Sequence, residues 1–402
     1  MFIKKLSIHG YRSCLDTAFD LRSDLSVLIG PNSSGKTNVL SALLLLRKLA
    51  TEETLFRRSE ATGQCQLKAW FELEERTAIL TAALDIYTDE HNKDTVVSSE
   101  QSWYAKDFTG NRKRIRMPLS VLREYVPGAE SFPFVRATRG YKKALREHAG
   151  TSDAVLQELS AIAERLATMR YYSASQFTDP SRCPVSFEIE QPSGRTRSLL
   201  PRPRGHTKFL YDLYSSSKDT KNPGYREFFD IVGPDGIGLV DEIIFQEIPT
   251  SSVEYSVRLG GAVRRRRREK SLVVPQFRIG TNDLSPNQLS EGTFKTITLL
   301  FYLITEPSKI LLIEEPEVCV HHGLLASIIE LIRAYSREKQ MIVSTHSDFV
   351  LDAVEPENVY IVTNTPEEGT KVASISKKMP RKELSALRSF LATEGNLGEN
   401  WR

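Results

Sequence analysis

One octapeptide near the start of the chain restricts its fold more than any other segment. Residues 30–37 read Gly-Pro-Asn-Ser-Ser-Gly-Lys-Thr, which fits the pattern GxxxxGK[ST]. Glycines let such a loop curl so that several backbone N–H groups face one phosphate, and a following helix adds its positive end. An apolar run, Leu25–Gly30, precedes the loop and a helical pattern, Thr37–Leu49, follows it. We therefore expect Lys36 to reach the β- and γ-phosphates of a nucleotide and Thr37 to bind Mg²⁺; a turn merely rich in glycine and serine is the alternative.

A second segment places acids after an apolar run. Residues 310–317 read Ile-Leu-Leu-Ile-Glu-Glu-Pro-Glu. A buried parallel strand would present Glu314 and Glu315 at its carboxyl end, where ligands lie in open α/β sheets. One carboxylate can hold Mg²⁺, and the next can orient and polarise an attacking water. A strand that ends in a solvated acidic turn is the alternative, which the phosphate loop upstream makes the weaker one.

Two shorter segments complete the pattern. Ser290, in Leu-Ser-Glu-Gly-Thr, stands before an apolar helical stretch at about 291–305, so it can cap that helix and leave exposed N–H groups for a second anion. His346, in Ser-Thr-His-Ser, follows the strand-like run Met341–Ser344. Its imidazole could contact a γ-phosphate or an attacking water, although a histidine at a strand end is by itself more often structural.

In this order, the phosphate loop, LSEGT, LLIEEPE and STH resemble the ATP-binding-cassette (ABC) ATPases of the SMC/RecF class. The branch shared with OLD-family and related phage-defence ATPases is the most similar, and GYRS near the start belongs to the same resemblance. The motifs cover about 1–75 and 240–360. The resemblance implies an α/β fold: a P-loop NTPase with an ABC-type ATPase head, a mixed, mostly parallel sheet and an inserted, mainly helical subdomain.

The resemblance also implies roles for single residues. Two ATP molecules would lie between the phosphate loop of one copy and the Ser290–Gly292 turn of another, in a homodimer or higher homo-oligomer. Catalytic roles would fall to Glu315, His346 and Lys36, and Mg²⁺ contacts to Thr37, Glu314 and Gln176. Contacts with ATP would come from Gly30, Asn32, Ser33, Ser34, Gly35, Lys36, Thr37, Asn38, Arg12, Ser290 and Gly292. The sequence departs from the family pattern in two places. The first acid, Glu314, stands where many members have Asp. The segment LSEGT stands in place of LSGGQ, and this second difference argues against a transporter subunit.

The alternation of strand and helix patterns suggests how the chain is divided. A length of 402 residues allows two to three domains. The motifs instead join 1–80, which holds the phosphate loop, and 236–402, which holds the other motifs, into one head around an inserted, partly helical subdomain at 81–235.

Within the middle of the chain, three segments have recognisable patterns. Thr77–Leu84 looks helical, and Ser98–Met117 looks like a hairpin. Ser152–Arg170 is the clearest helix, with apolar residues at steps of three and four. Two heptads of that pattern fit an ordinary packed helix, or alternatively a dimerising one.

A run of five arginines stands out against a net charge of only +3. It lies between strand patterns just after Gly260-Gly261, which suggests a hairpin tip. So dense a charge is solvated, or binds an acidic protein, or is relieved by a DNA or RNA backbone through counterion release. Any such nucleic-acid contact would be largely independent of base sequence, and its residues would be Arg264, Arg265, Arg266, Arg267 and Arg268.

Composition removes several classes of protein. Charged residues make up 26% and hydrophobic residues 40%, as in globular proteins. Four distant cysteines without a CxxC pair disfavour a zinc site or a disulfide framework and suggest a cytoplasmic protein, and no apolar run is long enough for a membrane span.

The region after His346 bears on the function. The 56 residues there contain no DxD pair, so a nuclease such as the OLD family carries would have to be a separate partner chain. We expect an ATPase that controls a DNA transaction or a partner effector, most of all in anti-phage defence. A RecF-like repair or recombination ATPase and a non-catalytic, ATP-bound sensor or scaffold are the alternatives.

Overall fold

The chain forms two compact units in a computed structural model. The first unit comprises Met1–Tyr172, Pro307–Glu317 and Ile329–Arg402, and the second comprises Ser173–Glu306 and Val318–Ile328. The structure describes residues 1–51, 62–73, 77–90, 94–106, 112–116, 124–125, 143, 146–147, 153–173, 179–190, 205–219, 223–257, 263–318, 320 and 322–378.

A six-stranded, mostly parallel sheet forms the centre of the first unit. Its strand order is β16-β15-β3-β14-β13-β8, and β3, β13, β14 and β15 run parallel. Every residue of β3, β13 and β14 is buried, as the apolar sequences of these strands require. The register pairs Ile29 with Thr345 and Glu314 with Ser344, so the carboxyl ends of these three strands meet. The bounds are β3 Leu25–Ile29, β8 Arg170–Ser173, β13 Ile310–Glu314, β14 Gln340–Thr345, β15 Val359–Thr365 and β16 Gly369–Ser374.

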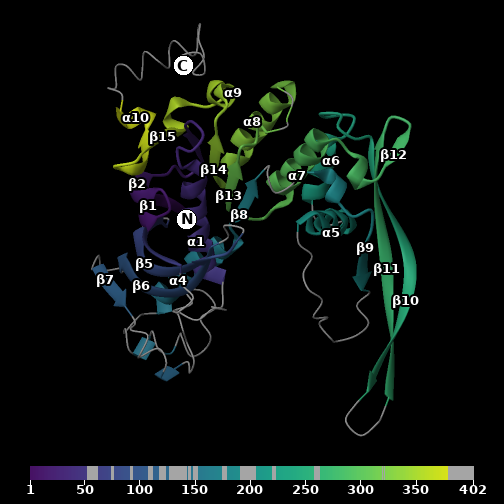
Figure 1. Cartoon of the computed structure of the whole chain (residues 1–402), viewed down its shortest axis with the longest axis horizontal. Coiled ribbons are helices and arrows are strands. Elements are labelled where there is room, and N and C mark those ends of the chain that lie inside the picture. The colour runs from purple at the N-terminus through teal and green to yellow at the C-terminus, as the bar shows by residue number, and fades with distance from the viewer. Residues whose placement is uncertain are drawn as a thin grey trace. The chain divides into compact units, whose positions relative to one another are not determined.

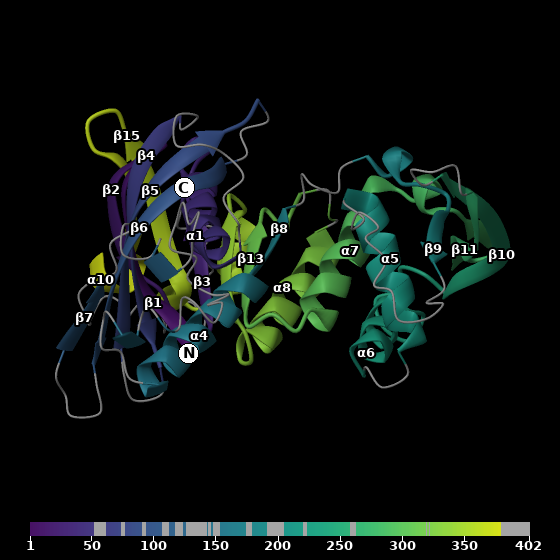
Figure 2. The ribbon, with the colours of Figure 1, turned by 90° about the horizontal axis from the view of Figure 1, so that it is seen from below.

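A second six-stranded sheet in the same unit is antiparallel. Its order is β2-β1-β4-β5-β6-β7, and residues along β4 and β5 alternate between buried and more exposed. Helix α1 (Lys36–Thr51) contacts β1 and β6 of this sheet and β14 of the other, so it lies between the two sheets (Figure 2). The bounds are β1 Phe2–Tyr11, β2 Cys14–Asp20, β4 Gly63–Glu72, β5 Thr77–Thr88, β6 Asp94–Lys106 and β7 Arg112–Arg116.

One buried amide ties the two sheets together. The side chain of Gln340, at the start of β14, accepts a hydrogen bond from the backbone N–H of Ile3 (2.9 Å). Its Nε2 donates to the carbonyls of Ile3 (2.8 Å) and Arg22 (2.7 Å). Because all three backbone groups would otherwise need water, the amide fixes β1 beside the start of β14.

Helix α4 (Asp153–Thr168) carries the heptad pattern noted in the sequence. It contacts α1 and β13, and its apolar face belongs to the core of the first unit. The buried residues of that face are Val155, Leu156, Leu159, Ile162, Ala163 and Leu166. The pattern therefore reflects an ordinary packed helix.

The second unit combines helices with a four-stranded sheet in which β10 and β11 form a long antiparallel hairpin (Figure 1). Phe209 of α5 packs edge-on against Phe294 and Phe301 of α7, with ring centroids 5.5 and 5.8 Å apart. The bounds are η3 Pro180–Arg182, β9 Phe187–Glu190, α5 Gly205–Lys218, α6 Pro223–Val232, β10 Glu242–Val257, β11 Val263–Ile279, β12 Asn282–Leu284, η4 Pro286–Gln288 and α7 Glu291–Thr305.

Four elements complete the described chain. Helix α8 (His322–Ser336) starts in the second unit and ends in the first, and α9 (Asp348–Asp352), η5 (Pro356–Asn358) and α10 (Ile375–Lys378) belong to the first. No helix in the described ranges is long and apolar enough to cross a membrane.

The main differences from the sequence expectations fall in the middle of the chain. Thr77–Leu84, expected to be helical, lies in strand β5, where Ala78, Leu80, Ala82 and Leu84 are buried at alternate positions. The expected division at 80 and 235 also differs from the observed units. Strands β5 and β6 complete the antiparallel sheet, and the chain passes into the second unit only after Tyr172. The hairpin expected over Ser98–Met117 is confirmed as part of β6 and β7.

Candidate nucleotide site

The phosphate loop connects β3 to α1, as the sequence predicts. Ser33 (φ 68°) and Gly35 (φ 97°) adopt left-handed backbone conformations that curl the loop. A Cβ atom on Gly35 would lie 2.0 Å from Thr370 Oγ1, and one on Gly30 would lie 2.3 Å from the carbonyl oxygen of Val362. Close neighbours thus require glycine at both positions, and the curl of the loop requires it at Gly35 as well.

Side chains from the far end of the chain hold the loop in place. Thr370 Oγ1, on β16, donates to the carbonyl of Ser34 (3.3 Å) and shares a hydrogen bond with Ser13 Oγ (2.7 Å). Asn364, on β15, donates from Nδ2 to the carbonyl of Ser33 (3.2 Å). The loop conformation is therefore set by strands that lie more than 300 residues later in the sequence.

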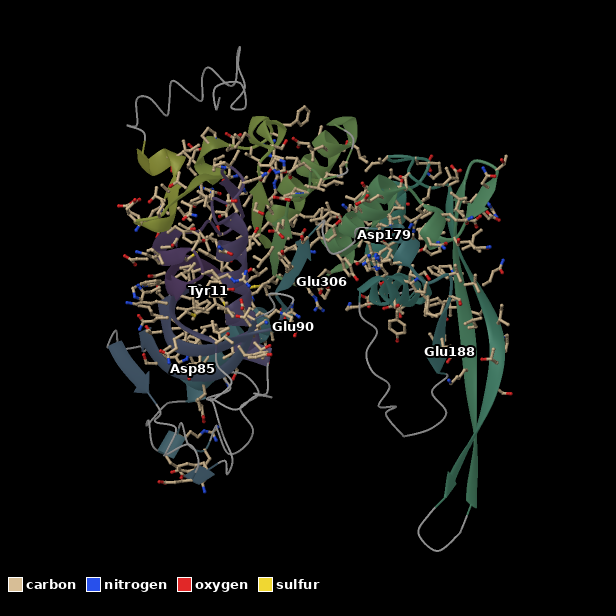
Figure 3. The ribbon with its side chains drawn as sticks, in the orientation of Figure 1. Tyr11, Asp85, Glu90, Asp179, Glu188 and Glu306 are labelled. Atoms are coloured by element: carbon tan, nitrogen blue, oxygen red, sulfur yellow. The ribbon has the colours of Figure 1, made fainter. Side chains whose placement is uncertain are left out.

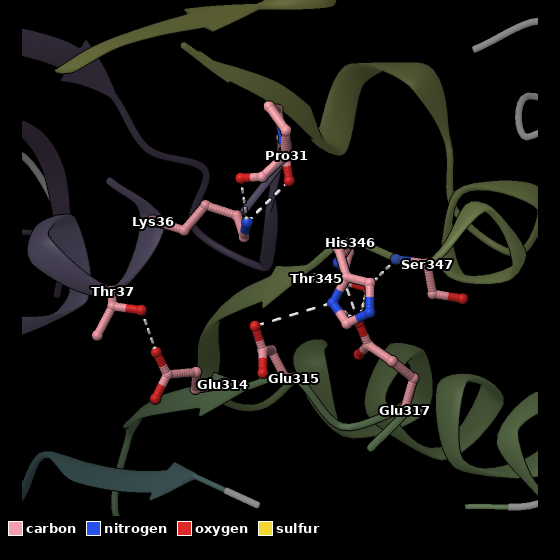
Figure 4. Close-up of polar contacts among 10 residues, drawn as sticks. Pro31, Lys36, Thr37, Glu314, Glu315, Glu317, Thr345, His346 and Ser347 are labelled. Atoms are coloured by element: carbon pink, nitrogen blue, oxygen red, sulfur yellow. Dashed lines mark hydrogen bonds and ion pairs between the residues drawn. The ribbon is translucent and has the colours of Figure 1, made fainter. Parts of the chain in front are cut away.

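Lys36 is the buried cation of the loop. Its Nζ donates to the carbonyls of Gly30 (2.8 Å) and Pro31 (3.0 Å), as Figure 4 shows. Burial lowers the pKa of Lys36, and the carboxylates of Glu315, Glu317 and Glu314 oppose that shift. An incoming polyphosphate would offer the ammonium group an opposite charge in place of these two neutral carbonyls.

The expected Mg²⁺ ligands meet at the carboxyl end of β13. Thr37 Oγ1 donates to one carboxylate oxygen of Glu314, and the hydroxyl of Tyr171, on β8, donates to the other. A hydroxyl and a carboxylate, completed by phosphate oxygens and water, are the hard oxygen donors that Mg²⁺ prefers. The residues present therefore fit this ion, and Tyr171 holds the carboxylate from its other side.

Glu315 and His346 face each other at the ends of β13 and β14. Glu315 has a left-handed backbone (φ 48°), and its N–H donates to the carbonyl of Ser344 (2.9 Å). Its Oε1 lies 3.8 Å from Nδ1 of His346, whereas Oε1 of Glu317 lies 3.2 Å from that nitrogen (Figure 4). The two side chains expected to act on the attacking water, Glu315 and His346, thus lie at the same edge of the sheet. Glu317 lies closer to the histidine ring than Glu315 does.

Arg12 lies beside the first turn of α1. Its Nη2 pairs with buried Asp94 (3.0 Å), and its Nη1 approaches Asn38 Oδ1 (3.5 Å). Asp94 also accepts from the hydroxyl of Tyr11, the β1 residue labelled in Figure 3. Burial and this carboxylate raise the pKa of Tyr11, so its phenol stays protonated. The pairing thus holds Arg12 next to Asn38, in the first turn of the helix that follows the phosphate loop.

A pocket of about 520 Å³ opens beside the phosphate loop. Leu15, 44% exposed, lies on one of its walls, and the turn between β15 and β16 lies on another. Its lining comprises Ser13, Leu15, Pro31, Asn32, Ser33, Ser34, Asn364, Thr365, Pro366 and Gly369. The loop is therefore accessible from this side to the remainder of a nucleotide.

The remaining predicted residues lie elsewhere. Ser290 caps α7 in the second unit, where its Oγ accepts from the N–H of Thr293 (3.1 Å), and Gly292 occupies the first turn. The backbone of Arg264–Arg268 lies in β11 beside the tip of the β10–β11 hairpin, paired with residues 252–256 of β10. Gln176 lies outside the described residues.

Several residues of the site escape sequence reasoning. Tyr171, Asn364 and Thr370 belong to no motif, and nothing local marks them as partners of the loop. Glu317 is the last acid of the LLIEEPE segment, so its proximity to Glu315 was the available signal.

Comparison with known proteins agrees with this geometry. Residues 25–352 match the sequence family described as "AAA domain, putative AbiEii toxin, Type IV TA system". A stretch of 69 residues is 33% identical to the DNA replication and repair protein RecF of Crocosphaera subtropica, and it spans 16% of this chain and 18% of that protein.

Solved structures of SMC heads are also similar. The SMC head domain from Thermotoga maritima is 13% identical with a TM-score of 0.42, over 93% of this chain and 99% of that one. An SMC head bound to the C-terminal winged-helix domain of ScpA is 13% identical with a TM-score of 0.46, over 94% and 100%. The family match alone spans more than half of the chain, so the chain belongs to this family of AAA domains.

Proposed function

We propose that this protein binds ATP with Mg²⁺, dimerises around it and hydrolyses it. The observation that carries the proposal is the meeting of Lys36, Thr37, Glu314, Glu315 and His346 at the joined carboxyl ends of β3, β13 and β14. Phosphoryl transfer needs mainly positioning and charge neutralisation, and these groups supply both.

Each side chain has a distinct part in that chemistry. Lys36 would leave the carbonyls of Gly30 and Pro31 to neutralise the β- and γ-phosphates. Glu315, 36% exposed, would take up a proton from the attacking water as general base. Thr37 and Glu314 would hold Mg²⁺, which when bound neutralises charge on the phosphate oxygens.

The division into units supports the dimer. The phosphate loop belongs to the first unit, whereas the capped N-terminus of α7 belongs to the second. An exposed helix N-terminus with a serine hydroxyl favours anions. In the proposed dimer, the Ser290–Gly292 turn of one copy closes on the γ-phosphate held by the other, so ATP favours the closed dimer and hydrolysis removes that preference.

The dimer would control a DNA transaction or a separate effector protein such as a nuclease, in anti-phage defence. The family description, which names a toxin–antitoxin system, supports a defence role. The similarity to RecF supports the second candidate, an ATPase of DNA repair or recombination. The arginine-rich hairpin is compatible with either, because a flexible phosphate backbone relieves such a charge run without base readout.

The variant Glu315→Gln tests the ATPase proposal. We expect turnover to fall about 10²- to 10⁴-fold while ATP binding persists. Light scattering of this variant with ATP should show a dimer that ADP does not support. Glu72→Gln, at a partly exposed acid of β4 paired with Lys4, is the matched control and should behave as wild type. Unchanged turnover in Glu315→Gln would contradict the role of this carboxylate, and a monomer with ATP would contradict the dimer.

DNA stimulation distinguishes the two roles. Replacing Arg264–Arg268 by glutamine should weaken DNA binding and flatten its dependence on salt if the hairpin contacts the backbone. Turnover that rises with DNA in wild type and not in this variant favours repair. Turnover indifferent to DNA, with a nuclease or toxin co-purifying from the native host, favours defence.

A further inference from the structure

The carboxylate of Glu317, to which no sequence motif assigns a role, contacts both Thr345 and His346. Its Oε1 accepts from the hydroxyl of Thr345 (2.7 Å) and from the backbone N–H of His346 (2.9 Å). The same oxygen lies 3.2 Å from Nδ1 of His346, as Figure 4 shows. One oxygen atom therefore fixes both the main chain and the ring of the histidine.

This arrangement is built into the fold. The Glu317 side chain is only 8% exposed, and the turn that carries it is tied to β14 by the hydrogen bond from Glu315 N–H to Ser344 O. Glu315 Oε1, at 3.8 Å, is too far from Nδ1 for a hydrogen bond. Of the two acids near the ring, Glu317 is therefore the acceptor for Nδ1.

The other oxygen of Glu317 argues against a purely structural part. Its Oε2 is buried and accepts no hydrogen bond from any described residue. A buried oxygen without a donor lowers stability, so a carboxylate is a poor choice for simply holding a turn. The contact with the histidine ring explains why an acceptor oxygen stands here.

We infer that Glu317 is a positioning residue that selects the Nδ1–H tautomer of His346. The tautomer of an imidazole is set by the hydrogen bond that one of its nitrogens makes. In this tautomer Nδ1–H points at Glu317, so Nε2 keeps its lone pair and can only accept a hydrogen bond. His346 then accepts from the attacking water and helps Glu315 to orient it; a neutral ring in this tautomer cannot donate to a γ-phosphate oxygen.

The inference concerns the same site as the proposed ATPase and rests on it for its kinetic consequence. Glu317→Ala should lower kcat about 10- to 100-fold, with ATP affinity unchanged within about twofold, because the ring loses its orientation. Glu317→Gln should recover most of the loss, since the amide oxygen accepts from the same three donors. Thr345→Val, which removes a different donor to the same oxygen, should cost turnover much less than Glu317→Ala.

The tautomer itself is measured on the nucleotide-free protein, so the result does not depend on ATPase activity. Long-range ¹H–¹⁵N spectra of ¹⁵N-histidine-labelled protein report which ring nitrogen carries the proton, and His346→Asn assigns the signals. We expect Nδ1–H in wild type and in Glu317→Gln, and Nε2–H or a mixture in Glu317→Ala. Nε2–H in wild type overturns the inference whether or not the variants fold. Nδ1–H retained in folded Glu317→Ala overturns it as well, as does equal loss of kcat in the Ala and Gln variants. Normal tautomers with no ATP turnover would instead contradict the proposed function.

Discussion

Two helix N-termini in this protein are suited to anions, and they are built differently. The start of α1 is enclosed: Gly35 fits against Thr370, Ser33 is held by Asn364, and Lys36 is buried. The start of α7 is exposed, and a local hydrogen bond from Thr293 N–H to Ser290 Oγ caps it. Enclosure sets one phosphate site in advance, whereas an open cap suits a surface that becomes a site only against a partner.

The largest effect should come from removing the charge at the enclosed site. Lys36→Ala should weaken ATP binding about 100- to 1,000-fold and abolish turnover, because a buried cation that meets phosphate is lost. Isothermal titration with ATP measures the affinity. Lys4→Ala, an exposed lysine of β1, is the control and should bind as wild type. If Lys36→Ala kept the wild-type affinity for ATP, the buried lysine would not distinguish the N-terminus of α1 from that of α7 as a phosphate site.

Next in size is the loss of the close fit of the loop. Gly35→Ala should cost about 2–3 kcal/mol in the free energy of unfolding, since its φ of 97° is strained for alanine and its Cβ meets Thr370 Oγ1 at 2.0 Å. Urea denaturation measures it. Gly63→Ala, with a Cβ that meets nothing within 4 Å, is the matched control and should be nearly neutral. Equal stability of the two variants would show that the loop relaxes easily.

A substitution at the exposed N-terminus of α7 should have a smaller effect, and it should change turnover without changing ATP affinity. Ser290→Arg should lower turnover about 10- to 100-fold by blocking closure of the dimer, while ATP affinity of the monomer stays within about twofold. Ser215→Arg, at an exposed position of α5 in the same unit, should not affect turnover. If Ser290→Arg lost ATP binding in the monomer, the contrast between a complete and a partner-dependent site would be false.

The smallest effect concerns the support of the enclosed loop. Thr370→Val keeps the shape of the side chain and removes its hydrogen bonds with Ser13 and Ser34, so about 1 kcal/mol of stability should be lost. ATP affinity should fall only a few-fold in the same titration. A loss as large as that of Lys36→Ala would mean that the hydroxyl itself contacts the nucleotide.

The sequence predicts those parts of the two N-termini that depend on neighbouring residues in the chain. The phosphate loop, the cap at Ser290 and the helices that follow depend on glycines, a capping serine and local periodicity, all visible in a short window. The helix expected over Thr77–Leu84 is wrong because Ala78, Ala82 and Ala83 obscure the alternating pattern of strand β5 and favour helix. In β5 the helix propensity of these alanines is outweighed by the burial of one face of the strand within the antiparallel sheet.

The missing part of the site depends on register. Glu317 meets Thr345 and His346 only because β13 and β14 lie side by side with Glu314 opposite Ser344. Thr370 reaches the loop through β16, and the pairing of Arg12 with Asp94 crosses from β1 to β6. Such contacts follow from tertiary arrangement, which no short sequence window contains.

The position of β3 has a consequence for how the protein is made. This strand is synthesised early, yet its neighbours in the sheet are β14 and β15, about 300 residues later, and Gln340 joins Ile3 and Arg22 across the same span. At about 5–20 residues per second, a ribosome needs on the order of 15 to 60 s to supply those partners. Throughout that interval the apolar strand is unpaired and exposed, so folding of the nucleotide site is a late event and the nascent chain is a natural client for chaperones.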